Sequence, residues 1–263
     1  MQNIPAKKSL GQNFLKSKTA LLAMIKAGEI TKNDKVLEIG PGQGALTEKI
    51  LETGAKVIAV EKDDRLINFL EEKFGVEKAS GQFTLIHGDI LEIDLKKLGF
   101  KTVDYKLIAN IPYYITGLIF RKFLEGPVQP SKLVIMVQKE IADRIIARDN
   151  KESLLSLSVK AYGEAKKVMK VEKENFSPKP KVDSAILLIN NISKDFFKDI
   201  SEKDFFEVIK AGFAHKRKVL IANLKDTFNK KDLHKIFEEI KLSEKARSED
   251  LSLKDWKNLV QYM

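Results

Sequence analysis

The segment Asn110-Ile-Pro-Tyr113 combines residue types that can hold a flat base carrying an exocyclic amine, and it follows an apolar run that predicts a strand. The side-chain oxygen of Asn110 and the backbone carbonyl of Ile111 are two acceptors for the N–H groups of such an amine. Pro112 restricts Ile111 to extended conformations, which would hold that carbonyl in place. The face of Tyr113 can stack on the base.

This combination predicts methylation of an adenine amine. The lone pair of that amine is conjugated into the ring, and two acceptors would localise it and direct it at an electrophilic methyl group. No strong general base is needed, so catalysis would rest on positioning and acceptor electrostatics. The neutral Asn110 also suits a second transfer, because a monomethylated amine keeps one N–H. A plain strand-ending turn is the alternative for the tetrapeptide taken alone.

A glycine-rich turn follows another predicted strand in Val36-Leu-Glu-Ile-Gly-Pro-Gly-Gln-Gly44. Gly40 and Gly42 let the backbone turn sharply and approach a ligand closely. Glycine patterns alone are weak evidence, because dinucleotide-binding folds use a similar loop. A tight turn without a ligand is the other interpretation of this segment.

Acidic residues at the ends of the next two predicted strands favour a cofactor site. Glu61 lies 21 positions after Gly40, near the roughly 20 expected for a carboxylate that binds ribose hydroxyls. Asp89 can accept a hydrogen bond from an adenine amino group, with Ile90 against the ring, although an isolated Asp there is usually a turn residue or helix cap. Lys62 and Asn110 complete the set of residues predicted to bind the cofactor. S-adenosylmethionine fits better than NAD, because nothing supplies a hydride-transfer partner.

The elements that must position these residues alternate between short apolar runs and amphipathic stretches. Such alternation implies a parallel sheet covered on both faces. The predicted strands are Lys35–Ile39, Lys56–Glu61, Phe83–His87, Tyr105–Ala109, Leu133–Gln138, Lys167–Val171 and Ser184–Ile189. The last two have no helix between them and suit an antiparallel hairpin at one sheet edge. We therefore expect an α/β fold, a Rossmann-like class I methyltransferase with a seven-stranded, mostly parallel sheet.

The strand signals stop after about residue 190. Helical periodicity is found in Glu202–Phe213, Lys216–Phe228, Lys231–Ile240 and Leu253–Tyr262, with serine or aspartate near several starts. We predict two domains: residues 1–190 form the methyltransferase domain, and residues 191–263 form a small all-helical domain.

Composition narrows the class of protein further. A net charge of +10 over 263 residues favours a polyanionic partner, with a solubilising Lys/Glu-rich surface as the alternative. There is no cysteine, and His87, His215 and His234 lack metal-ligand spacing, so we expect no disulfide and no metal site. No apolar run approaches the roughly 20 residues of a membrane span, and no secretory signal is recognisable. We expect a cytoplasmic protein.

The chain resembles the ribosomal RNA adenine N6-dimethyltransferases, the superfamily of the KsgA and Erm enzymes, over nearly its full length. Lys8-Ser-Leu-Gly-Gln-Asn-Phe-Leu15 matches the family's N-terminal motif, which covers the cofactor. The resemblance implies that Gln12, Asn13 and Leu15 belong to the cofactor site. The motifs at the glycine turn, the two acidic strand ends and the Asn-Ile-Pro-Tyr segment follow in family order.

Phe176-Ser-Pro-Lys-Pro-Lys-Val-Asp-Ser184 matches the family's loop opposite the catalytic site. The resemblance implies that Phe176 is a second aromatic wall, which sandwiches a flipped adenine against Tyr113. From the residues alone, Phe176 is a core residue before a turn.

The C-terminal third favours the KsgA branch of this superfamily. Ala211-Gly-Phe-Ala-His-Lys-Arg-Lys-Val-Leu220 looks like the KsgA-type helix that carries a basic cluster, here Lys216, Arg217 and Lys218. Ala246-Arg-Ser-Glu-Asp-Leu-Ser-Leu-Lys-Asp-Trp256 looks like that branch's closing motif. Ile111 replaces the leucine more usual in KsgA-type proteins and is common among Erm enzymes. An Erm-type enzyme that acts on large-subunit RNA is therefore the alternative.

The KsgA branch implies a substrate and a partner. The substrate is a pair of adjacent adenines in a hairpin loop near the 3′ end of small-subunit ribosomal RNA, within a pre-small ribosomal subunit, and the enzyme is a monomer that uses S-adenosylmethionine. Extruding an already unpaired base costs less than opening a duplex. The basic cluster and its helical domain would bind RNA phosphates; a solvated helix end is the plain alternative. A protein acting mainly as a subunit assembly factor is a further hypothesis.

Overall fold

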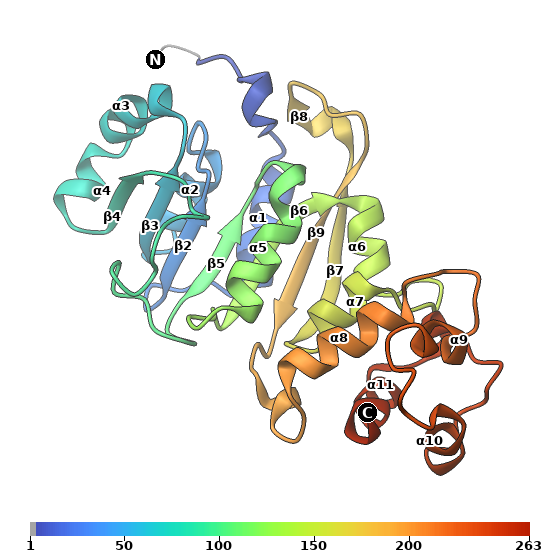
Figure 1. The fold of residues 1–263 in the computed structure, drawn as a ribbon. Coiled ribbons are helices and arrows are strands. Elements are labelled where there is room, and N and C mark those ends of the chain that lie inside the picture. The colour runs from blue at the N-terminus through green and yellow to red at the C-terminus, as the bar shows by residue number, and fades with distance from the viewer. Residues whose placement is uncertain (1–3) are drawn as a thin grey trace. The chain divides into compact units, whose positions relative to one another are not determined.

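The computed structural model, which describes residues 4–263, contains a seven-stranded sheet of order β4-β3-β2-β5-β6-β9-β7 (Figure 1). The strands are β2 (Lys35–Ile39), β3 (Lys56–Glu61), β4 (Phe83–His87), β5 (Lys106–Ala109), β6 (Lys132–Gln138), β7 (Glu164–Val171) and β9 (Ser184–Asn190). The first five are parallel, and β9 pairs antiparallel with both β6 and β7. The predicted α/β fold, with its antiparallel hairpin at one edge, is confirmed.

The central strands are apolar because both of their faces are covered. In β6 the run from Leu133 to Val137 is fully buried, as expected for a strand inside a parallel sheet. The edge strand β7 alternates between half-buried and exposed residues, and a bulge separates Lys167 from Met169. It begins at Glu164, earlier than predicted, because charged residues on its exposed side hide the strand signal.

Helices from the same part of the chain cover this sheet. They are α1 (Lys18–Gly28), α2 (Ala45–Leu51), α3 (Asp64–Lys73), α4 (Gly75–Ala79) and α5 (Thr116–Phe120); a further helix, α6 (Lys139–Ile145), follows β6 directly in the chain. Helix α1 packs against β5, β6, β7 and β9, and in Figure 1 α5 lies in front of the sheet while α1 lies behind it. Ser17 caps α1 by accepting the N–H of Ala20 at 3.3 Å, a common way to satisfy a helix start.

A small two-stranded sheet was not predicted. Strand β1 (Phe14–Leu15) pairs antiparallel with β8 (Phe176–Ser177). Two residues per strand carry no periodic signal, so the pattern of the sequence does not reveal this pairing. Its consequence is that the N-terminal motif and the loop with Phe176 are hydrogen-bonded to each other.

The chain divides into two compact units. One comprises the chain up to Ala142 together with Glu164–Ile192, and the other comprises Asp143–Gly163 with Ser193–Met263. The second unit contains α7 (Leu154–Lys160), α8 (Glu202–Gly212), α9 (Leu220–Lys225), α10 (Leu233–Glu239) and α11 (Leu253–Tyr262). Its core includes the fully buried Phe205 and Trp256. Within the described chain, no helix has the length and apolar character needed to cross a membrane.

Candidate active site

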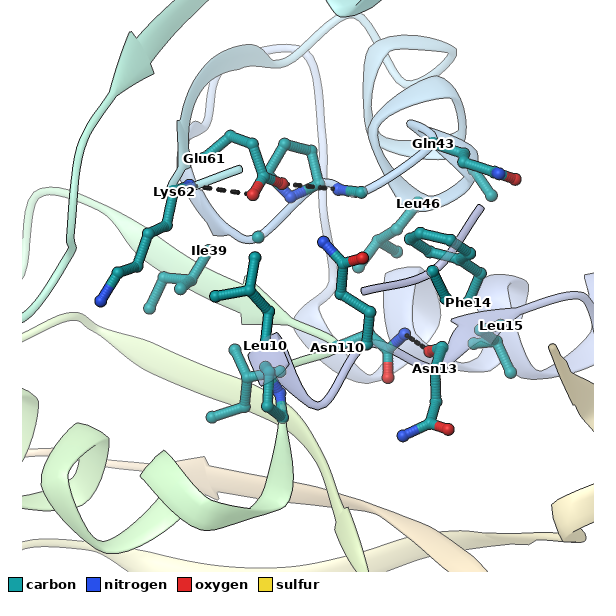
Figure 2. A pocket seen from close by; sticks show the side chains of 18 of the residues that line it. Leu10, Asn13, Phe14, Leu15, Ile39, Gln43, Leu46, Glu61, Lys62 and Asn110 are labelled. Carbon is teal, nitrogen blue, oxygen red and sulfur yellow. Dashed lines mark hydrogen bonds between the residues drawn. The ribbon is translucent and has the colours of Figure 1, made fainter. Parts of the chain in front are cut away.

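A cavity of about 580 Å³ lies where β2, β3, β4 and β5 end. Open α/β sheets bind ligands at this edge, and the volume suits a small molecule. The lining includes the glycine turn (residues 40–44), parts of residues 4–16, which we call the cover segment, and the loop Asn110–Tyr113. Figure 2 shows side chains from all three regions around one space.

The glycine turn has a backbone that side chains other than glycine rarely adopt. Gly40 and Gly42 have φ values of +63° and +60°. A Cβ atom on Gly40 would meet nothing within 4 Å, whereas one on Gly42 would lie 3.0 Å from the ring of Phe14 in the cover segment. The turn therefore leaves open space beside Gly40 and lets the cover segment approach closely at Gly42.

Glu61 is almost completely buried beside this turn and is held by backbone N–H groups. Its Oε1 accepts from Lys62 and Asp63 at 2.8 Å each, and its Oε2 accepts from Gly42 at 3.0 Å (Figure 2). Burial raises the pKa of Glu61, and the three N–H donors oppose that rise. A carboxylate has about four acceptor positions, so one position on Oε2 is left for a ligand.

Asp89 and Lys62, which both line the cavity, form an ion pair. The Lys62 Nζ lies 2.7 Å from Asp89 Oδ2, and Asp89 Oδ1 accepts the N–H of Leu91 at 2.9 Å. The hydrogen bond from Lys62 is the main cause that lowers the pKa of Asp89. Ile90 is buried and also lines the cavity. The structure thus brings these three predicted residues together.

Glu38 is a buried acid of the lining that the sequence analysis did not single out. It is 1% exposed and accepts a hydrogen bond from Thr47 Oγ1 at 2.6 Å. Burial raises the pKa of Glu38 to about 8. An acid two residues before Gly40 in an otherwise apolar strand was the available signal. Among residues 4–263, no three acidic or histidine side chains gather in a group that could hold a metal ion.

Gln12 fastens the cover segment to the residues that follow β3. Its Nε2 donates to Asp63 Oδ2 at 2.7 Å, and its Oε1 accepts from the backbone N–H of Lys7 at 2.7 Å. The Arg65 guanidinium also donates to Asp63 and is the main cause that lowers the Asp63 pKa to about 2. Gln12 is therefore bonded to an ionised carboxylate, which makes a stronger hydrogen bond than a neutral acceptor.

Asn13 and Leu15 both line the cavity, but Asn13 makes hydrogen bonds there whereas Leu15 pairs with another strand. The backbone carbonyl of Asn13 accepts a hydrogen bond from Asn110 Nδ2 at 3.3 Å, while its own side chain donates to the carbonyl of Gly11 at 3.1 Å. Leu15 is buried and pairs with Phe176 in the small sheet. The cover segment thus contacts both the cofactor motifs and the Asn110–Tyr113 loop.

Asn110 comes directly after β5, between the ends of β2 and β6. The Nδ2 atom of its side-chain amide donates a hydrogen bond to the backbone carbonyl of Asn13 (Figure 2). Within residues 4–263, Oδ1 makes no hydrogen bond, so it is available as an acceptor. Pro112 is extended, with φ −57° and ψ 136°. The side chain of Ile111 is buried, which leaves its backbone as the polar part of that residue.

Tyr113 is half-buried and begins a short 3-10 helix, Tyr113–Ile115. Its hydroxyl lies 2.6 Å from Oγ of Ser184, the fully buried first residue of β9. Burial raises the pKa of Tyr113, so the hydroxyl stays protonated at neutral pH. Sequence reasoning missed this contact, because nothing in the spacing of the two motifs shows that their ends meet.

Phe176 lines the same cavity but is only 4% exposed. It belongs to the apolar core that includes Leu15, Leu21 and Val171. The structure therefore shows Phe176 as a core residue beside the cavity. Its stacking on a base stays a prediction.

The basic cluster (Lys216, Arg217 and Lys218) does not lie on a helix as predicted. Helix α9 begins only at Leu220, and the three basic residues form an exposed turn before it. Asn223 Nδ2 holds this turn by donating to the carbonyls of Gly212 and His215, at 2.6 and 3.1 Å. The cluster therefore precedes a helix N-terminus, where the helix dipole does not favour positive charge.

Comparison with known proteins identifies the family. A family model described as ribosomal RNA adenine dimethylase matches residues 3–263. The chain is 41% identical to a ribosomal RNA small subunit methyltransferase A of Dehalococcoides mccartyi (strain CBDB1), over 97% of this chain and 88% of that protein. It is 40% identical to the protein of the same name from Fusobacterium nucleatum subsp. nucleatum, over 97% and 96%.

Solved structures agree with the fold. A dimethyladenosine transferase from Plasmodium falciparum superposes with a TM-score of 0.80 at 28% identity, over 94% of this chain and 95% of that one. The 23S rRNA methyltransferase ErmE gives a TM-score of 0.76 at 22% identity, over 95% and 99%, which shows the fold alone. On the full-length family match and the 41% identical relative, the chain is a methyltransferase that belongs to the ribosomal RNA adenine dimethylase family.

Proposed function

We propose that this enzyme transfers two methyl groups from S-adenosylmethionine to the N6 amine of each of two adjacent adenosines in a hairpin loop near the 3′ end of small-subunit ribosomal RNA. The observation that carries the proposal is the amide of Asn110, with Nδ2 tied to Asn13 and Oδ1 available beside the cavity. The names of the relatives, small subunit methyltransferases, favour that RNA. The enzyme would act as a cytoplasmic monomer on the pre-small subunit.

The lining of the cavity fits S-adenosylmethionine, which when bound supplies an electrophilic methyl group on a sulfonium. The open space beside Gly40 admits a ligand close to the backbone. The remaining acceptor position of Glu61 would bind one ribose hydroxyl. Asp89 would accept the cofactor's adenine amine, with Ile90 against its ring. Leu15 and the rest of the cover segment would cover the bound cofactor.

The loop Asn110–Tyr113 would present the target amine. Its two N–H groups would donate to Asn110 Oδ1 and to the carbonyl of Ile111, and the amine would lose a proton to solvent as it is methylated. Stacking on Tyr113 is worth about 1–3 kcal/mol. Phe176 would supply a second wall for the base if its ring turns out of the core that now buries it. After the first transfer, one N–H remains to bond Asn110.

The basic cluster would contact RNA phosphates rather than read bases. Lys216, Arg217 and Lys218 lie together in one exposed turn. Reversing all three charges should weaken binding to small-subunit RNA and make its salt dependence shallower, because fewer counterions are released. Filter binding over a range of salt concentrations measures this slope. An unaltered slope would place the RNA on another surface.

Transfer of labelled methyl groups tests the function. Small ribosomal subunits lacking the modification and naked large-subunit RNA would be offered in parallel, followed by nucleoside analysis. We expect N6,N6-dimethyladenosine in the small-subunit RNA alone. Label confined to large-subunit RNA would make this an Erm-type enzyme. No label in either RNA would refute the proposed substrate.

A further inference from the structure

The hydroxyl of Tyr113 and the side chain of Ser184 join two segments that are far apart in the sequence. The two oxygens lie 2.6 Å apart, which is a short hydrogen bond between hydroxyl groups. Tyr113 is half-buried, whereas Ser184 is fully buried. A buried hydroxyl requires a partner, and Tyr113 is the side chain that provides it.

Ser184 is held more firmly than the tyrosine it contacts. It opens β9 and pairs with Gln138 of β6 on one side and Val171 of β7 on the other. The preceding residue, Asp183, accepts the N–H of Lys139 through its backbone carbonyl at 2.9 Å. Because β9 runs opposite to the parallel strands, it begins at the edge where they end. Ser184 is therefore a fixed point beside the cavity.

Tyr113 is the first residue of a short 3-10 helix, and the direction of its ring depends on rotation about its side-chain bonds. Pro112 restrains the backbone before it, but it does not hold the far end of the ring. The hydroxyl is at that far end, so a hydrogen bond there limits the swing of the ring axis. Ring rotation about that axis does not move the hydroxyl, and base stacking would set it.

We propose that Ser184 is a positioning residue that holds the long axis of the Tyr113 ring, so that its face stays where the target adenine stacks. This role rests on the proposed function. Ser184 does not line the cavity, so it acts through Tyr113 rather than on a ligand. Ser184→Ala and Tyr113→Phe each remove one partner of the bond, and Tyr113→Phe keeps the stacking face.

The test is a double-mutant cycle on the single-turnover rate of methyl transfer to unmodified small subunits. We expect each single variant to be about three- to tenfold slower, the usual effect of one hydrogen bond. The double variant should be no slower than the slower single variant, because both substitutions remove the same bond. Binding of S-adenosylmethionine should be unchanged in all three.

A matched control separates positioning from stability. Tyr105→Phe removes another tyrosine hydrogen bond, from its hydroxyl to the carbonyl of Val128 at 3.0 Å, and Tyr105 is buried away from the cavity. It should lower the thermal unfolding midpoint without changing the transfer rate. A full rate for Tyr113→Phe, or single effects that multiply in the double variant, would overturn the role of Ser184. Absence of transfer by the unsubstituted enzyme would instead refute the proposed function.

Discussion

The two sides of the cavity are held in different ways. On the side proposed to bind the cofactor, which we call the cofactor side, buried Glu61 accepts three backbone N–H groups and buried Glu38 accepts a hydrogen bond from Thr47. On the side proposed to hold the target base, which we call the catalytic side, the side chain of Asn110 makes one hydrogen bond to the described residues, of 3.3 Å, and the side chain of Tyr113 makes one, of 2.6 Å. The side chains of the cofactor side are thus preorganised by more hydrogen bonds than those of the catalytic side, where one hydrogen bond holds Asn110 and one holds Tyr113.

This difference suits an enzyme that must use one amine twice. The methyl donor is presented in the same way for each transfer, so a rigid cofactor side hinders neither transfer. The acceptor changes, because the amine carries one methyl group when it returns for the second transfer. In the proposed mechanism, a loop held by few hydrogen bonds accommodates both forms of the amine while Asn110 Oδ1 stays in place as the acceptor. Substitutions on the two sides should therefore have separable effects.

The largest effect should follow removal of the acceptor on the catalytic side. Asn110→Ala should lower the transfer rate by about 100- to 1,000-fold, as for other electrostatic groups at a reacting centre. Affinity for S-adenosylmethionine should stay within about threefold, because the cofactor side keeps its contacts. Rates and calorimetric titrations measure the two. The exposed Asn33, as Asn33→Ala, is the control. Unchanged turnover of Asn110→Ala would remove Asn110 from the mechanism.

On the cofactor side, Glu38 should make the free energy of unfolding depend on pH. The folded-state pKa of Glu38, about 8, exceeds its ordinary 4.5, so between these values the folded protein keeps a proton that the unfolded chain has lost. The free energy of unfolding therefore falls as the pH rises through that window. Glu38→Gln removes this term. Relative to the unsubstituted protein, the variant should gain about 2–4 kcal/mol between pH 5 and 8.

Denaturant unfolding at several pH values measures this difference. A constant difference between Glu38→Gln and the unsubstituted protein would show that Glu38 is ionised at neutral pH in the folded protein.

Removing the ring of Tyr113 should weaken only the catalytic side. Tyr113→Ala should slow transfer by about ten- to a hundredfold, since base stacking is worth about 1–3 kcal/mol. The unfolding midpoint should fall modestly in both Tyr113→Ala and Tyr113→Phe, because each leaves the buried hydroxyl of Ser184 without the Tyr113 hydroxyl as its partner. Single-turnover rates and thermal unfolding would be compared with those of Tyr113→Phe, which keeps the ring. Equal rates for the two variants would mean that the base is held elsewhere.

The smallest effect should follow from removing the hydrogen bond that holds the cover segment to Asp63. Gln12→Ala removes the hydrogen bond to Asp63, which stays ionised because of Arg65. Affinity for S-adenosylmethionine should fall about three- to tenfold, with little change in rate at saturating cofactor. Titration and saturation kinetics separate the two quantities. A slower rate with unchanged affinity would assign the cover segment to the catalytic side.

Part of this molecule was predictable from local patterns. The predicted bounds of Lys35–Ile39, Lys56–Glu61 and Phe83–His87 coincide with the observed strands, because strands of a parallel sheet are nearly continuous apolar runs. The residues at their ends were predictable as well, since parallel strands end at one edge. Edge strand β7 and the two-residue strands β1 and β8 were harder to predict. Exposed charged residues in β7, and the shortness of β1 and β8, remove the hydrophobic periodicity that marks a strand.

Contacts between distant segments were not predictable. The bond between Tyr113 and Ser184 joins the segment after β5 to the start of β9, and the bond from Gln12 to Asp63 joins the cover segment to the N-cap of α3. Neither has a periodic pattern, and both arise only when the sheet is assembled. The turn of the basic cluster was misread because Asn223, seven residues after Lys216, supplies the hydrogen bonds that delay the helix.

The central claim is that one neutral amide oxygen serves two successive transfers to the same amine. A time course of nucleosides from unmodified small subunits, with limiting enzyme and excess S-adenosylmethionine, tests it most directly. The account predicts that N6-methyladenosine appears, passes through a maximum and is converted to N6,N6-dimethyladenosine, and that Asn110→Ala slows both steps. Accumulation of N6-methyladenosine as the final product, or an Asn110→Ala variant that slows only one step, would contradict it.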